Sequence, residues 1–174
     1  LEVYEDQIKN KFIIGYTGNS SAPLGLTVGK AGKVAWYISA RLNPDYFLES
    51  SYSTNGVNIT DYDGRGYYEF TGETKTARAS FTGGLGFRII KDVVYLYVGG
   101  GYGVKRLLWE TEDFSYESSN SLATEYAEYT DFTYAGYEVE SGLLFSLNKV
   151  FFAFGASSVQ SKRLDASFSF GLSF

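Results

Sequence analysis

Apolar and polar residues alternate along most of this chain, and the alternation is clearest at its C-terminal end. Over the last eleven positions the apolar set is Leu164, Ala166, Phe168, Phe170, Leu172 and Phe174, and the small or polar set is Asp165, Ser167, Ser169, Gly171 and Ser173. Because side chains of a strand point alternately to its two faces, this period of two predicts a strand with one apolar face. A strand of about ten residues is what a tilted β-strand needs to cross a bilayer. The alternative is the last strand of a soluble sandwich.

Seven further segments carry the same alternation. They are predicted at 11–18, 23–29, 34–43, 76–89, 93–108, 133–147 and 150–158. The total of eight is even, as single-chain bacterial barrels require. We therefore predict an all-β protein that forms a closed, eight-stranded, antiparallel, up-and-down transmembrane β-barrel over residues 11–174, preceded by a periplasmic segment at 1–10.

The connections between these strands alternate in length. Residues 30–33, 91–92 and 148–149 form tight turns with basic residues, whereas 44–75 and 110–131 are long, polar and rich in Tyr. Outer-membrane barrels have short periplasmic turns and longer extracellular loops. The pattern predicts long extracellular loops and periplasmic termini in the outer membrane of a Gram-negative cell.

One face of the predicted strands is aromatic and the other carries charges and glycines. The lipid-facing aromatic residues are predicted to be Phe12, Trp36, Phe81, Phe87, Phe145, Phe152, Phe154, Phe168 and Phe170. A soluble eight-stranded lipocalin would place its apolar face inward. Such a barrel would not bury charges among glycines, so the membrane interpretation is favoured.

Composition agrees with this interpretation. The 174 residues include 16 Tyr, 14 Phe and 20 Gly but no Cys, Met or His, so a disulfide framework and a thiolate metal site are excluded. No stretch of 18 apolar residues predicts a transmembrane helix. The acidic start at Leu1–Asp6 is unlike a signal peptide, so we expect a mature or trimmed chain.

These features together resemble the small eight-stranded OmpA/OmpX-type barrels over roughly residues 11–174. The terminal Phe174 resembles the C-terminal signature that the barrel-insertion machinery reads in bacterial outer-membrane proteins. The stretch Ala22–Gly29, followed by a strand with adjacent Trp and Tyr, looks like small barrels of Bacteroidetes-type bacteria. The resemblance implies outer-membrane lipid and the insertion machinery as partners.

Seven charged side chains are predicted to point into the lumen. They are Arg41, Arg78, Arg88, Lys105, Glu138, Glu140 and Asp165. An unpaired buried charge is costly, so these groups should pair with each other or with water. We expect Arg78 or Arg88 to bind Glu138 or Glu140 bidentately. The cluster is interpreted either as the lining of a selective pore or as a plug, and the plug is favoured because eight strands enclose little space.

Catalysis is not expected. As families, small outer-membrane acyltransferases, deacylases, phospholipases and proteases use a catalytic His, and this chain has none. Glu138 and Glu140 share a strand face, but basic neighbours should neutralise them. The glycines of 99–103 lie inside a predicted strand, where they indicate close packing and not a phosphate-binding loop.

The long loops are acidic and aromatic. Their acidic residues are Asp45, Glu49, Asp61, Asp63, Glu69 and Glu73 in one loop, and Glu110, Glu112, Asp113, Glu117, Glu125, Glu128 and Asp131 in the other. This distribution and the net charge of −5 argue against nucleic acid as a partner. Asp61 and Asp63 form only a fragment of a calcium loop, so no metal or other cofactor is expected.

Three functions remain open. The first is a structural or accessory subunit, with a plugged polar lumen, that docks with another outer-membrane protein. The second is a surface adhesin or recognition barrel that uses its Tyr-rich acidic loops. The third is a narrow, porin-like channel for small solutes. A lipid-facing groove of small residues would favour the first, ordered loops with exposed aromatic rings the second, and a continuous water path the third.

Overall fold

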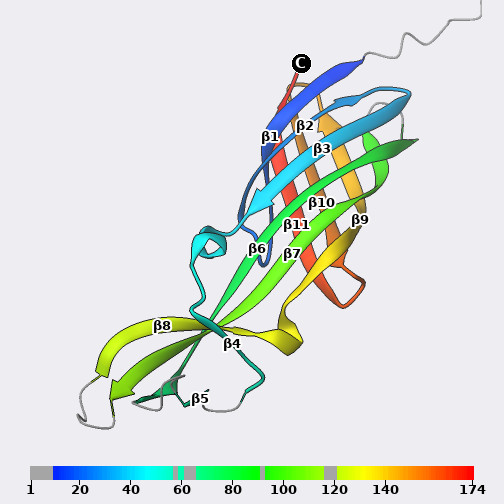
Figure 1. The fold of residues 1–174 in the computed structure, drawn as a ribbon. Helices are drawn as coiled ribbons and strands as arrows, with labels where there is room; N and C mark the ends of the chain where they lie inside the picture. Colours follow the sequence, from blue (N-terminus) through cyan, green and yellow to red (C-terminus); the bar gives the residue numbers. More distant parts are fainter. Residues whose placement is uncertain (1–9, 57–58, 61–65, 91–92, 116–120) are drawn as a thin grey trace, which may run out of the picture.

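Eight strands close into a barrel, and two of them continue beyond it as a second sheet (Figure 1). The structure is a computed structural model that describes residues 10–56, 59–60, 66–90, 93–115 and 121–174. The barrel strands are β1 (Lys11–Asn19), β2 (Leu24–Ala31), β3 (Val34–Leu42), β6 (Gly66–Ile90), β7 (Val94–Ser115), β9 (Tyr134–Leu147), β10 (Val150–Val159) and β11 (Arg163–Ser173). The predicted segment at 1–10 lies almost wholly outside the described residues.

Each barrel strand pairs antiparallel with its neighbour, and β1 closes the ring against β11. The register runs from Ile13 opposite Ser173 to Asn19 opposite Ser167. Beyond this register, the backbone amide of Phe12 donates to the carbonyl of Phe174 at 2.6 Å, and the amide of Phe174 donates back at 3.0 Å. The predicted eight-stranded barrel of OmpA/OmpX-type architecture is therefore confirmed.

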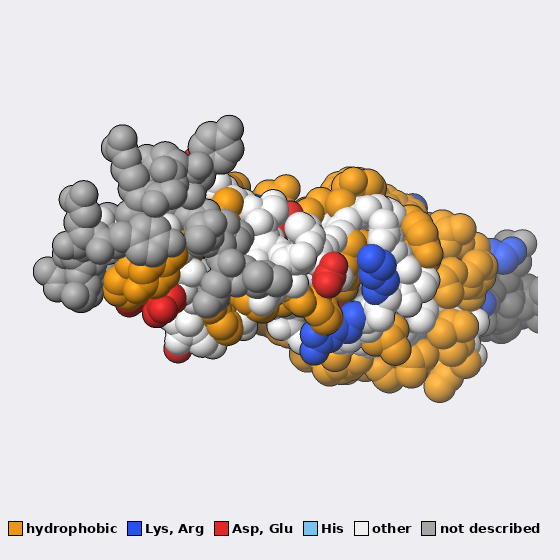
Figure 2. All heavy atoms as spheres, turned by 60° about the horizontal axis from the view of Figure 1, so that its bottom comes forward, with side chains coloured by type: hydrophobic (Ala, Val, Ile, Leu, Met, Phe, Trp, Pro, Cys, Tyr) orange, Lys and Arg blue, Asp and Glu red, His pale blue; other side chains and the backbone are white. Residues whose placement is uncertain are grey.

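The outer surface of the barrel is apolar, as the alternation predicted. Trp36 and Phe168 lie on it with 39% of each residue exposed. The other predicted aromatic residues of this surface are also exposed, except Phe145, which is half-buried. Figure 2 shows the resulting band of hydrophobic side chains around the barrel. An apolar exterior around a polar, charged interior is the arrangement of a transmembrane barrel. Within the described part of the chain, no helix is long and apolar enough to cross a membrane.

Local turn chemistry shapes both rims. Asn148 adopts φ +41° in the two-residue turn between β9 and β10, a conformation that Asn tolerates better than most residues. At the opposite rim, Asn19 Oδ1 accepts hydrogen bonds from the amides of Ser21 (3.1 Å) and Ala22 (2.6 Å), which closes the β1–β2 connection.

The interior is divided into an apolar half and a charged half. Ile13, Tyr95, Leu144 and Phe151 belong to a buried cluster in the half that contains the short β9–β10 turn. Glycines on the inward face leave room for the tyrosine side chains that lie against them. A Cβ on Gly99, for example, would lie 2.1 Å from the Tyr37 hydroxyl. The large side chains of a narrow barrel are accommodated in this way.

The predicted boundaries of the long loops were wrong. β6 has 25 residues and β7 has 22, so both strands run well past the barrel rim. β8 (Ser121–Tyr129) pairs with β7, while the short β4 (Tyr52–Thr54) and β5 (Ile59–Thr60) pair with β8 and β6. We call this extension the projecting sheet (Figure 1). Two single turns of 3₁₀ helix, Pro44–Phe47 and Thr130–Phe132, connect it to the barrel.

Candidate functional site

Six of the seven predicted lumen charges lie together inside the barrel. Arg41 comes from β3, Arg78 from β6, Lys105 from β7, Glu138 and Glu140 from β9, and Asp165 from β11. All six are buried, and Arg78 has no exposed surface at all. Three positive and three negative charges balance in this cluster, which we call the lumen cluster.

Arg78 is the centre of the lumen cluster. Its Nη2 donates to Glu138 Oε1 at 2.6 Å, and its Nη1 contacts Asp165 Oδ2. The predicted pair of Arg78 with Glu138 is therefore present, but the guanidinium bridges two carboxylates, from β9 and β11, and does not fork onto one. β9 and β11 both flank β10, and the closed barrel brings Arg78 of β6 within reach of their carboxylates.

The remaining cations pair in the same way. Arg41 Nη1 donates to Glu140 Oε2 at 2.6 Å, and its Nε donates to the Thr17 hydroxyl at 3.1 Å. Lys105 Nζ lies 3.3 Å from Asp165 Oδ2. Each buried charge therefore has an opposite charge within reach, which offsets the cost of removing it from water.

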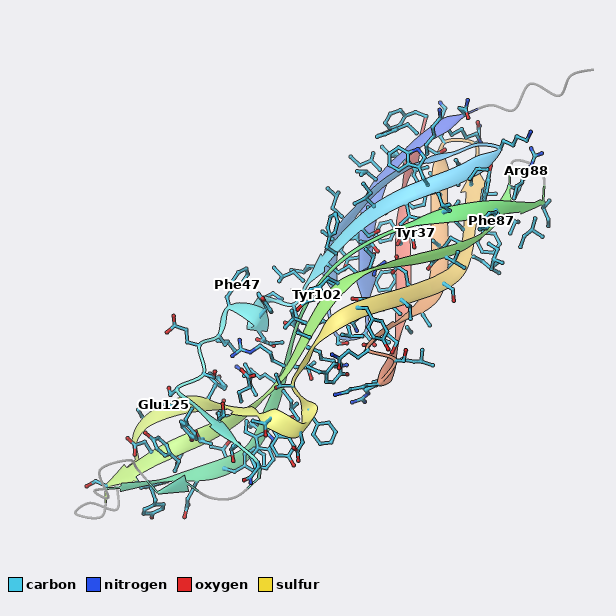
Figure 3. All side chains as sticks on the ribbon, turned by 45° about the vertical axis from the view of Figure 1, so that its right-hand side comes forward. Tyr37, Phe47, Phe87, Arg88, Tyr102 and Glu125 are labelled. Carbon is cyan, nitrogen blue, oxygen red and sulfur yellow. The ribbon has the colours of Figure 1, made fainter. Side chains whose placement is uncertain are left out.

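Arg88 does not belong to the lumen cluster. It is ten residues from Arg78 on the same strand, which corresponds to roughly 33 Å at a strand rise of about 3.3 Å per residue. Figure 3 places Arg88 beside Phe87 at the barrel end opposite the projecting sheet. The alternation along β6 predicts which face of the strand carries Arg88. It carries no information on how far along the barrel axis the residue lies.

A small cavity lies beside these groups. A cavity of about 20 Å³ is lined by residues that include Tyr37, Arg41, Tyr97 and Phe151, and it has room for about one water molecule. Three buried atoms of the lumen cluster, Arg78 Nε, Glu138 Oε2 and Glu140 Oε1, have no hydrogen-bond partner among the described residues.

One face of the projecting sheet is acidic. Glu69 on β6 lies directly opposite Glu112 on β7, and Glu110 and Glu128 share that face by strand parity. We call these four residues the acidic face. Like charges in direct cross-strand register repel each other. At the root of this face, Arg106 Nε binds Glu128 at 2.8 Å.

Lys75 is held on the same face by a tyrosine. Its Nζ lies 2.8 Å from the Tyr126 hydroxyl and 4.9 Å from the ring centroid. The hydrogen bond to Tyr126 raises the pKa of the Lys75 ammonium.

The other face of the projecting sheet carries a row of aromatic rings. Phe70 stacks on Trp109 with ring centroids 4.4 Å apart, Trp109 on Tyr129 at 4.6 Å, and Tyr129 on Phe132 at 5.4 Å. Tyr52 contacts the Tyr68 ring at 4.5 Å and donates to the buried Thr111 hydroxyl at 2.6 Å. The high Tyr content was the sequence signal for this row, but its rings come from segments that only the fold brings together.

The remaining predictions of chemistry concern metals and catalysis. Within the part of the chain that the structure describes, no three acidic residues are grouped so that they could hold a metal ion. Asp61, Asp63 and Glu117 lie outside it. Glu138 and Glu140 each pair with an arginine inside the barrel, so neither carboxylate stands in an open cleft.

The known proteins that match this chain are solved structures. No protein-family model and no curated protein sequence matches this chain. The crystal structure of Ail, the attachment invasion locus protein of Yersinia pestis, aligns with a TM-score of 0.49 and 15% identity over 95% of this chain and 98% of that one. Ail in complex with the heparin analogue sucrose octasulfate aligns with a TM-score of 0.47 and 14% identity over the same shares.

Proposed function

We propose that this protein is a non-enzymatic, integral outer-membrane protein that presents its projecting sheet outside the cell as a recognition surface. The observation that carries the proposal is the continuation of β6 and β7 beyond the barrel. At about 3.3 Å per residue β6 is roughly 80 Å long, far more than a membrane-spanning strand of about ten residues requires. The excess length serves to hold a rigid sheet away from the bilayer.

The orientation follows from the two ends of the barrel. The β9–β10 turn and the paired C-terminal residue Phe174 lie at the end opposite the projecting sheet (Figure 1). Short turns belong to the periplasmic side of outer-membrane barrels. We therefore place the termini in the periplasm and the sheet outside, with Phe174 read by the insertion machinery.

The sheet offers two kinds of contact. Its acidic face would attract a cationic partner, and its aromatic rings provide contact area that loses little conformational entropy on binding. Figure 3 places Glu125 in the projecting sheet and Phe47 on the connection that leads to it, both away from the barrel. Ordered strands with exposed aromatic rings are the feature that favours recognition over the other two functions.

We also propose that the lumen does not conduct. The paired ions of the lumen cluster and the aromatic side chains beside it lie in the interior, and the cavity between Tyr37, Arg41 and Phe151 has room for about one water molecule. On this proposal the cluster makes the barrel a rigid support for the sheet.

The orientation can be tested directly because the chain has no cysteine. Single cysteines would be introduced as Glu112→Cys in the sheet and Lys149→Cys in the β9–β10 turn. In intact cells a bulky polyethylene-glycol maleimide should label the first variant, and it should label the second only after the outer membrane is opened. Labelling of Lys149→Cys in intact cells would overturn the proposed orientation.

Recognition would be measured as retention of cells on a panel of immobilised proteins and polysaccharides. Cells that produce the protein should be retained more strongly than cells without it on at least one member of the panel. The pair Glu69→Gln and Glu112→Gln should reduce that retention, whereas Lys33→Gln and Lys149→Gln at the other end should not. Equal retention of producing and non-producing cells on every surface would contradict the proposal.

One observation favours the accessory-subunit function as a second candidate. Gly83, Gly100, Ser141, Ala156 and Ala166 lie on the outward face of five consecutive barrel strands, β6, β7, β9, β10 and β11. Small residues let another apolar surface approach closely in a membrane. If this function holds, a photocrosslinker placed at Ser141 should capture a partner protein in native membranes. A photocrosslinker placed at Leu85 should not capture that partner.

A further inference from the structure

We infer that the extracellular mouth of the barrel contains a binding site for a phosphate-type oxyanion. Thr76, Lys105, Leu107, Phe132, Tyr134 and Arg163 line a cavity of about 40 Å³ at the mouth. We call it the mouth pocket. It lies where the barrel meets the projecting sheet: Phe132 in its lining also belongs to the aromatic row, and Arg106, which completes the lining, binds Glu128. The inference does not depend on what the sheet recognises.

The mouth pocket carries an excess of positive charge. The lumen cluster beneath it is neutral, because its three cations face three carboxylates. Arg163 lines the pocket and Lys162 lies over the ring of Tyr134, another lining residue, whereas Arg106, also in the lining, is paired with Glu128. Among the described residues, no ion pair joins Lys162 or Arg163 to a carboxylate. Figure 2 shows Lys and Arg side chains at this end of the barrel, with an Asp or Glu side chain beside them. An excess of two charges matches a phosphate group, which carries −1.5 to −2 at neutral pH.

The side chains of the mouth pocket are held in place before any ligand arrives. Gln160 in the β10–β11 turn donates from Nε2 to the Ala135 carbonyl at 2.7 Å, which ties this turn to β9. Lys162 lies over the Tyr134 ring at 4.7 Å from its centroid. Arg163 follows in register with Val159 at the base of the same turn. A site that is already ordered loses less entropy on binding.

The surroundings of the mouth pocket strengthen its attraction for an anion. Lys105 is buried, with its Nζ 3.3 Å from Ser21 Oγ and 3.3 Å from Asp165. Leu107 and Phe132 add apolar surface to the lining, and charge–charge interactions are stronger where less water is present. Arg163 adds a planar guanidinium, whose geometry suits a phosphate oxygen pair. The lining therefore combines charge, partial dryness and donor geometry for a tetrahedral oxyanion.

The test uses the full chain refolded in an uncharged maltoside detergent that contains no phosphate. Sodium phosphate is titrated at constant ionic strength, and the amide signals of Lys105, Tyr134 and Arg163 are followed by NMR. Their shifts should saturate, and the combined change Lys162→Gln and Arg163→Gln should weaken binding at least about tenfold. Both side chains are exposed, so this variant should fold. The matched control, Lys33→Gln with Lys149→Gln, should bind as the unmutated protein does.

A second arm separates the two sources of the oxyanion. The protein is placed in phosphatidylcholine nanodiscs with and without phosphatidylglycerol, in phosphate-free buffer. Shifts at the same amides that need phosphatidylglycerol would assign the site to an anionic lipid headgroup. Shifts that need added phosphate would assign it to a soluble ligand. Shifts that do not saturate, or an unchanged affinity in the double variant, would overturn the inference.

Discussion

The Arg78 guanidinium on β6 lies 2.6 Å from the Glu138 carboxylate on β9, and neither side chain has any exposed surface. The two residues are 60 positions apart in the chain and meet only because the barrel closes. Removing one partner leaves the other charge buried without compensation, and this consequence can be measured.

Arg78→Ala should lower the free energy of unfolding by about 3–5 kcal/mol, the loss typical of a broken buried ion pair. Urea unfolding in detergent micelles would measure it. Arg106→Ala provides the control, because the Arg106–Glu128 pair has a similar distance of 2.8 Å but is partly exposed. An exposed pair contributes about 1 kcal/mol or less. Equal losses in the two variants would mean that the lumen cluster contributes no more than a surface contact.

If the lumen cluster and the tyrosines close the interior, as proposed, the unmutated protein should give no steady conductance in a planar bilayer. Arg78→Ala combined with Glu138→Ala removes two long side chains from the same depth and should produce a small ohmic current. Lys33→Gln is the control for insertion and handling. A steady current in the unmutated protein would identify the cluster as the lining of a pore.

Gly99 and Gly100 are adjacent on β7 but face opposite sides of the barrel wall, so they form a matched pair. A Cβ at Gly99 would lie 2.1 Å from the Tyr37 hydroxyl, whereas the nearest atom to a Cβ at Gly100 is the Glu138 carbonyl oxygen at 3.5 Å. Gly99→Ala should therefore destabilise the barrel by about 1–3 kcal/mol, the usual cost of overpacking. Gly100→Ala should change the stability little. Thermal or urea unfolding of the two variants would show the difference, and equal effects would contradict the inward packing of Tyr37.

The two tryptophans should report different environments. Trp36 lies on the apolar outer surface of the barrel, and Trp109 lies in the aromatic row of the projecting sheet. In vesicles of brominated lipid, the fluorescence of Trp109→Phe, which retains Trp36, should be quenched. The fluorescence of Trp36→Phe should be quenched much less. The reverse result would place the sheet, and not the barrel, in the bilayer.

The faces of the strands could be predicted from the sequence because parity along a strand is a local property. Trp36, Phe168 and the buried Arg41, Arg78 and Asp165 each follow from counting residues by two. The number of barrel strands followed as well, since each strand carries its own alternation. The projecting sheet was missed because its segments mix charged, polar and aromatic residues without a regular period of two. Phe70, Trp109 and Glu112 are therefore free of the apolar–polar alternation that revealed the barrel.

Partners across the lumen were decided only by the closed structure. Parity assigned Arg78 and Arg88 to the same face, yet Arg78 binds Glu138 and Asp165 while Arg88 lies at the other end of the barrel. The depth of a side chain depends on the stagger between strands, and that stagger is fixed when β1 pairs with β11. The alternation along one strand can therefore be predicted from the sequence. The register between strands is fixed only when all eight strands close into the barrel.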